Sequence, residues 1–268
     1  MEHSWRNLVE GYLNYKRKLG FDISVDATRL FQFAKFAEKW HSEPYLTIDL
    51  CIRWAQASKK QDAVTWTRRI DVLRGLAKYL KRFDARNEIP PTGLFGSGRR
   101  RLIPHIFTEV ELVVLLQSAG RLSPPGGLRP DTCRTIFGLL SATGLRIGEA
   151  LALTNEDVDL ANKVLRIGAS KGHRPRIVPL HSSVPVELKA YIRLRNRIVR
   201  NPSSQSFFLT DNGKPVNKRQ LLYALHVLCR QLNWLPRGDY PNHRLHDVRH
   251  TFIAAKKFEQ YAQGGVND

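Results

Sequence analysis

Three short stretches of the chain concentrate residue types that bind and transform charged groups. They are Thr143–Leu151, which contains Arg146, the segment around Lys171, and His246–Phe252, which contains Arg249. Arginine and lysine carry positive charges with several hydrogen-bond donors, and histidine exchanges a proton near neutral pH. Arg146 and Arg249 together therefore predict a grip for an anion.

Each stretch taken singly also has a purely structural explanation. Arg146 and Glu149 lie three positions apart and could form a surface ion pair on a helix. Lys171 precedes a glycine, as turn residues often do. His246 and His250 lie four positions apart on one helical face and could simply flank a hydrophobic core. The anion site therefore depends on the three stretches acting together.

A zinc site is the sharpest rival interpretation. His246, Asp247 and His250 mimic the two-histidine helix of metalloproteases, in which a glutamate after the first histidine acts as general base. Here that residue is an aspartate, one methylene shorter, and no acidic third ligand stands out downstream. Arg249 would also lie beside the metal and repel it. We therefore expect neither a metal nor another cofactor.

The composition favours a polyanionic partner. The chain has 43 Lys and Arg against 24 Asp and Glu, a net charge of +19, which predicts binding to nucleic acid or to an anionic membrane. No apolar run approaches the roughly 18 residues that span a bilayer, and the N-terminus does not resemble a secretory signal. Three scattered cysteines indicate reduced thiols in a bacterial cytoplasm.

The first ninety residues predict helices only. Apolar residues at helical spacing outline four segments: Leu8–Leu19, Leu30–Trp40, Ile48–Ala57 and Ala63–Phe83. The fourth segment has a basic face that includes Arg68 and Arg69. We expect these two arginines to contact DNA, with a solvated helix surface as the equal alternative.

A change of composition marks a domain boundary. Residues 90–98 hold two prolines and three glycines without periodicity, and Arg99, Arg100 and Arg101 follow. This pattern predicts a helical domain over 1–92, a basic linker over 93–104 and a second domain over 105–268. The three linker arginines are further candidates for DNA contact, and the hinge could let two domains close around a duplex. A plain tether is the alternative.

The second domain predicts mixed helices and strands. Thr108 and Glu111 form the pattern of a capping box at the start of a helix over 109–119. The other expected helices are Thr132–Ala142, Val186–Val199, Lys218–Leu232 and His246–Ala262. The expected strands are Val158–Leu160, Val164–Ile167 and Arg174–Leu180. They suggest a small antiparallel sheet whose second turn presents Lys171.

The order of the chemical stretches resembles the tyrosine recombinase (phage integrase) family. In that family an arginine follows a Thr-Gly-Leu turn, a lysine lies on a β-hairpin, and His-x-x-Arg-His-Thr-Phe comes later. Residues 143–151 and 246–252 match this pattern closely, and the resemblance covers nearly the whole chain. It implies a mainly α fold with a small antiparallel β-sheet: a helical, SAM-like core-binding domain that clamps DNA, and a mixed α+β integrase catalytic domain.

The resemblance also implies roles for the candidate residues. Arg146 and Arg249 would hold the scissile phosphate of double-stranded DNA through their planar guanidinium forks. Lys171 would protonate the departing 5′ oxygen, and His246 would assist proton transfer. Because such donors stabilise the charge of the transition state, no metal is required. Supporting roles fall to Glu149 and His250.

The family pattern also needs a tyrosine nucleophile well beyond the second arginine. The sequence ends at Asp268, 19 positions after Arg249, and Tyr261 is the only later tyrosine. On one continuous helix Tyr261 would lie about 18 Å along the axis from Arg249. A nucleophile must approach to roughly 3–3.5 Å of the phosphorus. We therefore expect a catalytic domain truncated at its C-terminal end, with the nucleophile unidentified and Tyr261 unsuited to the role.

Two functions remain open on these grounds. The first is an active integrase or recombinase, such as a mobile element encodes, which cleaves and rejoins DNA through a 3′-phosphotyrosyl intermediate. The second is a DNA-binding remnant or regulator that holds recombination-site DNA without strand transfer. The resemblance implies a homo-oligomer on DNA, weakened here by the missing C-terminal helix. Both functions predict duplex DNA as the partner and a cytoplasmic, nucleoid-associated protein.

Overall fold

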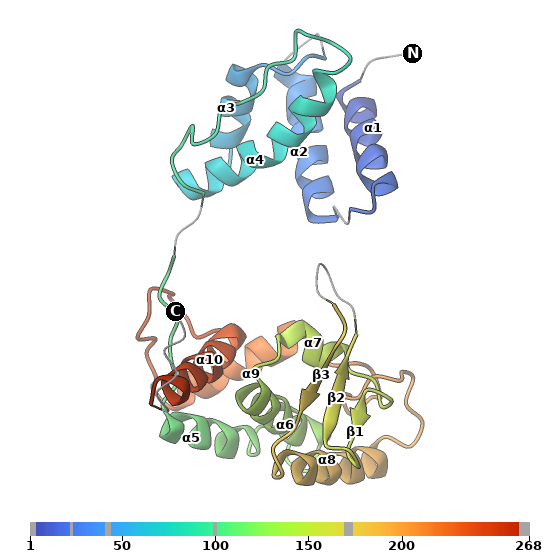
Figure 1. Ribbon diagram of the computed structural model, residues 1–268, viewed down its shortest axis with the longest axis vertical. Helices are drawn as coiled ribbons and strands as arrows, with labels where there is room; N and C mark the ends of the chain where they lie inside the picture. The colour runs from blue at the N-terminus through green and yellow to red at the C-terminus, as the bar shows by residue number, and fades with distance from the viewer. Residues whose placement is uncertain (1–3, 22–23, 41–43, 99–100, 169–173, 263–268) are drawn as a thin grey trace. The chain divides into compact units, whose positions relative to one another are not determined.

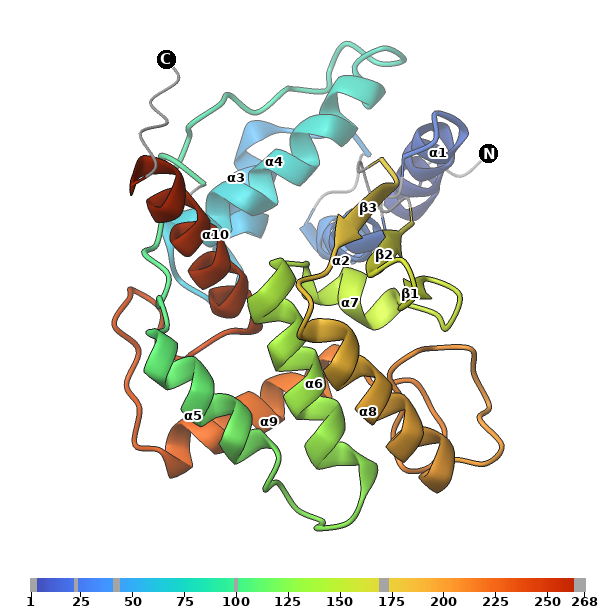
Figure 2. The ribbon, with the colours of Figure 1, turned by 60° about the horizontal axis from the view of Figure 1, so that its bottom comes forward.

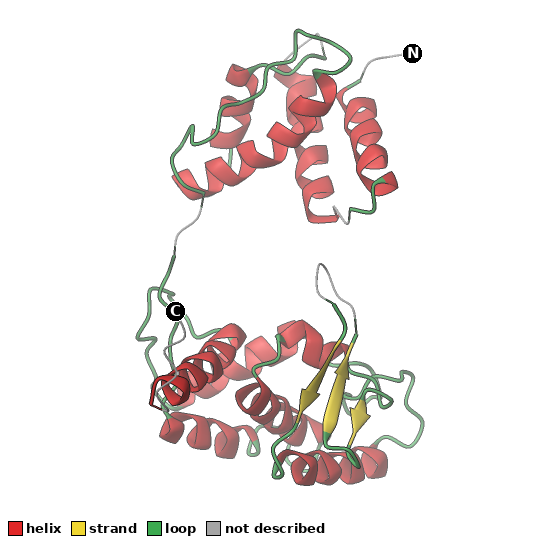
Figure 3. Ribbon diagram, in the orientation of Figure 1, coloured by secondary structure: helices red, strands yellow, loops and turns green. Residues whose placement is uncertain are grey.

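The chain forms two compact units, Met1–Arg101 and Leu102–Asp268, each with its own hydrophobic core. The computed structural model describes residues 4–21, 24–40, 44–98, 101–168 and 174–262 (Figure 1). Helices dominate these residues, and the strands form one three-stranded antiparallel sheet in the second unit (Figure 3). The expected mainly α fold class is confirmed.

The described residues of the first unit form four helices around an aromatic core. They are α1 (Trp5–Lys18), α2 (Ser24–Trp40), α3 (Ile48–Gln56) and α4 (Ala63–Leu80). The buried rings of Trp5 and Trp54 both pack edge-to-face on Phe33, with ring centroids 5.3 and 5.4 Å apart. The Thr47 side chain accepts a hydrogen bond from the Leu50 N–H and so begins α3 where the sequence predicts.

The segment after α4 folds back on that helix. Arg74 of α4 donates hydrogen bonds to the carbonyls of Pro90 and Pro91, at 3.0 and 2.7 Å. Farther along, Phe95 packs edge-to-face on Trp66, with ring centroids 5.3 Å apart. Residues 93–98 therefore belong to the first unit, in contrast to the linker expected over 93–104. Their prolines and glycines form an irregular segment that nevertheless buries side chains against α4.

The second unit is built around α6 (Leu128–Thr143), which packs most extensively against three other helices (Figure 2). Those helices are α5 (Glu109–Ala119), α8 (Val184–Ile198) and α10 (Leu245–Ala262). The unit also contains α7 (Ile147–Ala152) and α9 (Lys218–Gln231). α6 starts four residues earlier than expected. Pro130 does not prevent this start, because it lies in the first turn, where a missing N–H costs no helical hydrogen bond.

The sheet has the strand order β1–β2–β3. Its strands are β1 (Val158–Asp159), β2 (Val164–Ile167) and β3 (Arg176–Pro179). Val164 pairs with Pro179 and Ile167 with Arg176 in the β2–β3 ladder. The hairpin connection after this last pair contains Lys171, which lies outside the described residues.

The described helices include no candidate for a membrane-spanning segment. Within the described part of the chain, none of the helices combines the length and apolarity that crossing a bilayer would need.

Candidate functional site

The turn between α6 and α7 places Arg146. α6 ends at Thr143, and Gly144 adopts a left-handed conformation, with φ of 60°, that stops the helix. A Cβ on Gly144 would also lie only 2.8 Å from a ring carbon of Phe252 on α10. Glycine therefore both reverses the chain and lets α10 approach the turn. Arg146 follows as the N-cap residue of α7.

Arg249 reaches the same turn from α10. Its Nη1 donates a hydrogen bond to the carbonyl of Gly144, although the two residues are 105 positions apart in sequence. Partial burial lowers the pKa of Arg249, and the neighbouring positive charge of Arg146 lowers it further. The structure therefore brings together the two arginines that the sequence singled out, as like charges that an anion could bridge.

Glu149 binds the backbone and the side chain of Arg146. One carboxylate oxygen accepts a hydrogen bond from the Arg146 N–H at 2.8 Å, and the other accepts one from its Nη1 at 3.1 Å. The Glu149 side chain is only 4% exposed. Burial acts to raise its pKa, but hydrogen bonds from Arg176 and Arg146 outweigh burial and hold the pKa at about 2. The carboxylate is therefore ionised at neutral pH.

Arg176 is a member of this cluster that the sequence did not reveal. It begins β3, and its two terminal nitrogens donate to the two Glu149 oxygens at 3.0 and 2.8 Å. Its partner lies 27 positions away, so no local spacing links the two residues. Only a correct fold of the sheet onto α7 could have identified the contact.

His246 lies at the start of α10 with its side chain exposed. Packing around the ring lowers its pKa, and the positive charge of Lys218 at the start of α9 lowers it further, as do His250 and two arginines. The imidazole is therefore neutral at physiological pH, with a nitrogen able to accept a proton. His250 is also exposed, one helical turn farther along α10.

Asp247 has a structural role that is incompatible with its being the general base of a zinc site. It is fully buried, and its two oxygens accept hydrogen bonds from the N–H, Nε and Nη2 of Arg244, at 2.8, 3.0 and 2.6 Å. It therefore caps the first turn of α10 and is not available as a general base. Across the residues that the structure describes, no three His, Cys, Asp or Glu side chains are grouped to hold a metal ion.

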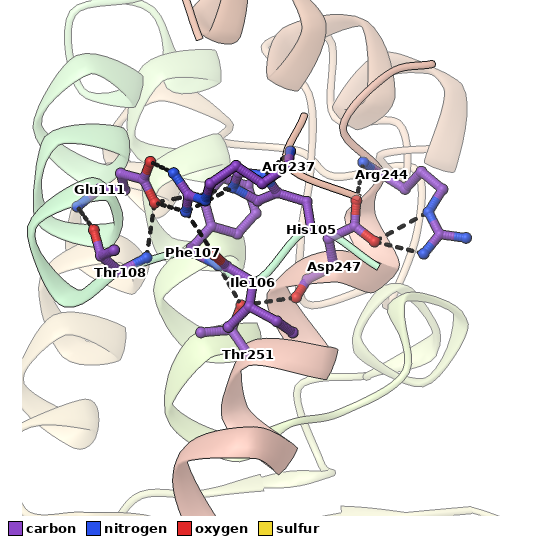
Figure 4. A network of polar contacts seen from close by, with 9 residues as sticks. All are labelled: His105, Ile106, Phe107, Thr108, Glu111, Arg237, Arg244, Asp247 and Thr251. Atoms are coloured by element: carbon purple, nitrogen blue, oxygen red, sulfur yellow. Dashed lines mark hydrogen bonds and ion pairs between the residues drawn. The ribbon is translucent and has the colours of Figure 1, made fainter. Parts of the chain in front are cut away.

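A second set of polar contacts anchors α10 and the chain that enters the unit (Figure 4). The Thr251 hydroxyl accepts a hydrogen bond from the Phe107 N–H and donates one to the Asp247 carbonyl, each at 2.9 Å. Arg237 donates through both terminal nitrogens to Glu111, at 2.5 and 2.6 Å. We call His105, Glu111, Arg237, Arg244, Asp247 and Thr251 the anchor network. It holds the helix that carries His246 and Arg249.

The remaining candidates for DNA contact differ from one another. Arg68 is exposed, and its Nε donates to the Gly98 carbonyl at 3.2 Å. Arg69 instead lies over the ring of Trp54, with its guanidinium carbon 4.0 Å from the centroid, and partial burial lowers its pKa. Arg101 is exposed. Three other candidates, Lys171, Arg99 and Arg100, lie outside the described residues.

Comparison with known proteins decides the family. Residues 112–256 match the phage integrase family. Over 255 residues the chain is 32% identical to the integrase/recombinase y4rB of Sinorhizobium fredii, covering 93% of this chain and 80% of that protein. The chain belongs to the phage integrase family. This membership confirms the resemblance to tyrosine recombinases.

Other tyrosine recombinases support the same assignment. This phage integrase family member is 27% identical to the tyrosine recombinase XerC of Herpetosiphon aurantiacus, over 90% of this chain and 78% of that protein. Its fold matches the Tn1549 transposon integrase bound to transposon right end DNA with a TM-score of 0.70 at 18% identity, covering 97% and 91% of the two chains. It also matches the XerH site-specific recombinase bound to palindromic difH substrate, with a TM-score of 0.64 at 19% identity, covering 91% and 73% of the two chains.

Proposed function

We propose that this chain acts in site-specific DNA recombination by binding duplex DNA and holding the scissile phosphate between Arg146 and Arg249. The observation that carries the proposal is the meeting of these two arginines at the Gly144 turn with their positive charges close together. Two relatives of the same fold are described in complex with DNA, the Tn1549 integrase and XerH. The net charge of +19 supports the same partner.

The proposed chemistry needs no metal. Guanidinium groups pair with phosphate oxygens through two parallel hydrogen bonds and stabilise the charge that develops during displacement at phosphorus. His246, neutral and exposed beside Arg249, would hydrogen-bond the phosphate or move a proton. Lys171, which the sequence places between β2 and β3, would protonate the 5′ leaving oxygen. His250 would support the same face of α10.

The first unit would supply further contacts to the DNA backbone. Residues 1–92 would act as the core-binding domain, with Arg68 as its clearest candidate because that side chain is exposed on α4. The arginines of 99–101 would add phosphate contacts where the chain passes to the catalytic domain, 105–268. Phosphate contacts of this kind position a protein on DNA without reading its sequence.

Duplex binding by arginine variants tests the phosphate grip. We expect Arg146→Ala and Arg249→Ala each to weaken duplex binding and to reduce the slope of log affinity against log salt by about 1, as for one lost phosphate contact. Fluorescence anisotropy over a salt series measures both quantities. Lys256→Gln is the matched control, because it removes one exposed charge farther along α10. Equal losses in the control and in the arginine variants would contradict the grip.

A nicked suicide substrate tests strand transfer. An active chain would form an SDS-resistant 3′-phosphotyrosyl adduct with it. Tyr261 lies on the same continuous helix as Arg249, about 18 Å along the axis, and is 67% exposed. This geometry favours a second function for the chain alone, DNA holding without covalent attack. An adduct that disappears in Tyr261→Phe would refute that second function, whereas tight binding without an adduct would support it.

A further inference from the structure

Arg176 pairs with Glu149 more completely than Arg146 does. Both terminal nitrogens of Arg176 donate to the carboxylate, one to each oxygen, at 3.0 and 2.8 Å. The Arg146 side chain contributes a single bond, from Nη1 at 3.1 Å. The bidentate fork, the stronger of the two geometries, therefore belongs to the arginine that no catalytic motif includes.

The carboxylate of Glu149 has no capacity left for another donor. Its two oxygens offer about four lone-pair positions. Four hydrogen bonds fill them: two from Arg176, one from the Arg146 N–H and one from the Arg146 side chain. At 4% exposure the side chain has little access to water. If Arg176 left, two of these positions would lose their donor inside a nearly buried site.

The charges around Glu149 explain what Arg176 contributes. Three arginines, Arg146, Arg176 and Arg249, surround one carboxylate, which leaves two positive charges in surplus. Without Arg176, the buried carboxylate would draw the fork of Arg146 into a bidentate pair, and its negative charge would oppose a phosphate bound alongside. With Arg176 in place the carboxylate is neutralised, so Arg146 keeps donors and charge for an anion.

We propose that Arg176 is a positioning residue: it satisfies the Glu149 carboxylate so that Arg146 is free to grip phosphate. This inference rests on the proposed function, because it assumes that Arg146 binds a DNA phosphate. Glu149 caps α7 and orients Arg146, and Arg176 cancels the charge that this orientation introduces.

Direct contact between Arg176 and phosphate is the competing role, since the Arg176 side chain is 37% exposed. The two roles differ in their dependence on Glu149. A positioning residue matters only while the carboxylate carries its charge, whereas a direct phosphate contact matters with or without it. A double-mutant cycle separates these cases.

The cycle consists of Arg176→Gln, Glu149→Gln and the double variant in the full chain, with anisotropy on a labelled duplex as the readout. We expect Arg176→Gln to lower affinity about tenfold and to reduce the salt slope by about 1, because Arg146 is drawn to the carboxylate. We expect the double variant to recover to within about threefold of the parent chain. Arg176→Lys, which keeps the charge without the fork, should be intermediate.

Arg166→Gln is the matched control. Arg166 lies on the neighbouring strand β2, is 56% exposed and pairs with Asp159 at 2.7 Å, so its loss removes the same charge from the same sheet. We expect less than about a twofold change in affinity, as for an exposed charge without a specific partner on DNA. A loss equal to that of Arg176→Gln would overturn the proposal in favour of a bulk charge effect.

Several results would decide against the positioning role. A loss of affinity that persists unchanged in the double variant would assign Arg176 to direct contact with phosphate. No loss of affinity in Arg176→Gln would show that the Arg176–Glu149 pair has only a structural role. Urea unfolding of each variant verifies that the second unit stays folded, and Arg176→Lys provides the comparison if Glu149→Gln does not fold. If Arg146→Ala binds as the parent chain does, the proposed function itself fails; if it weakens binding and the cycle is additive, only the positioning role fails.

Discussion

Two clusters of arginines and carboxylates in the second unit differ in charge balance. One is the anchor network, which joins the segment before α5 to α10 (Figure 4). The other we call the arginine turn, made of Arg146, Glu149, Arg176 and Arg249. Both contain a buried carboxylate, Asp247 or Glu149, that accepts at least three hydrogen bonds. The difference lies in how many positive charges surround it.

In the anchor network each carboxylate has its own arginine. Glu111 accepts both terminal nitrogens of Arg237, and Asp247 accepts the backbone and side chain of Arg244. The hydrogen bonds from Arg237 hold the pKa of Glu111 at about 2, although partial burial opposes them. Such one-to-one pairing leaves no charge for an outside partner, so the network serves the fold.

In the arginine turn three guanidinium groups lie near one carboxylate, and two of them, Arg146 and Arg176, pair with it. Arg249 donates to a backbone carbonyl instead of a carboxylate, and its pKa is lowered by burial and by the charge of Arg146. Like charges held together raise the free energy of the empty site, and an anionic ligand would lower it. Matched charge thus indicates a structural role, and surplus positive charge indicates a binding role. Substitutions in the two clusters test this contrast.

Asp247→Ala should have the largest effect on stability. The carboxylate is fully buried, and its loss removes the cap of α10 and leaves Arg244 without its partner. We expect a loss of about 3 kcal/mol in the free energy of unfolding, the low end for a broken buried pair because Arg244 keeps some access to water. Urea unfolding followed by circular dichroism measures it.

Glu259→Ala is the control for Asp247→Ala. Glu259 pairs with Lys256 on the same helix, but both side chains are 56% exposed. We expect a change below about 0.5 kcal/mol for this surface pair. Comparable losses in the two variants would contradict the distinction between buried and exposed pairs.

Acidification should act on the anchor network through His105. Burial lowers the pKa of His105 to about 4, with further lowering by His243 and Arg237, against raising by Glu111 and Asp247. The unfolded chain, with a histidine pKa near 6.5, binds the proton first. Stability is therefore full above about pH 6.5 and falls as pH drops toward 4, by roughly 3 kcal/mol from this group.

Urea unfolding between pH 7 and pH 4 measures this loss. His105→Gln keeps an acceptor for the Arg237 N–H, which donates to His105 Nδ1 at 3.1 Å, and should flatten part of the pH dependence. His243 and His246, whose pKa values are also lowered mainly by burial, contribute to the remainder, and near pH 4 the carboxylates with depressed pKa values add to it. His181→Gln is the control because His181 is exposed. An unchanged pH profile in His105→Gln would show that the His105 imidazole is not a source of the pH dependence of stability.

Local sequence signals predicted the elements that carry local hydrogen bonds. Thr108 and Glu111 indicated a capping box, and both of its hydrogen bonds are present, at 3.2 and 2.7 Å. The same signal could not reveal that Glu111 also pairs with Arg237, 126 positions away. α7 was missed as a helix because its six residues are too few to show helical periodicity.

The arginine turn also contains residues that the sequence predicted and one that it did not. The pairing of Arg146 with Arg249 was predicted through the order of family motifs, since no spacing rule connects residues that lie more than a hundred positions apart. Arg176 belongs to no such motif, and the strand pattern does not say which buried carboxylate its side chain meets. Family resemblance therefore identifies the residues proposed to touch substrate, whereas the charge balance around them requires the folded chain.

Arg249→Gln should have the smallest effect on stability and so completes the contrast with Asp247→Ala. The substitution removes one of three neighbouring positive charges, and glutamine can still donate to the Gly144 carbonyl. Relief of repulsion offsets the lost contact, so we expect the free energy of unfolding to change by less than about 0.5 kcal/mol. Urea unfolding measures it beside duplex binding, which should weaken in the same variant. A loss of stability as large as that of Asp247→Ala would show that Arg249 serves the fold, and the surplus charge of the arginine turn would then need another explanation.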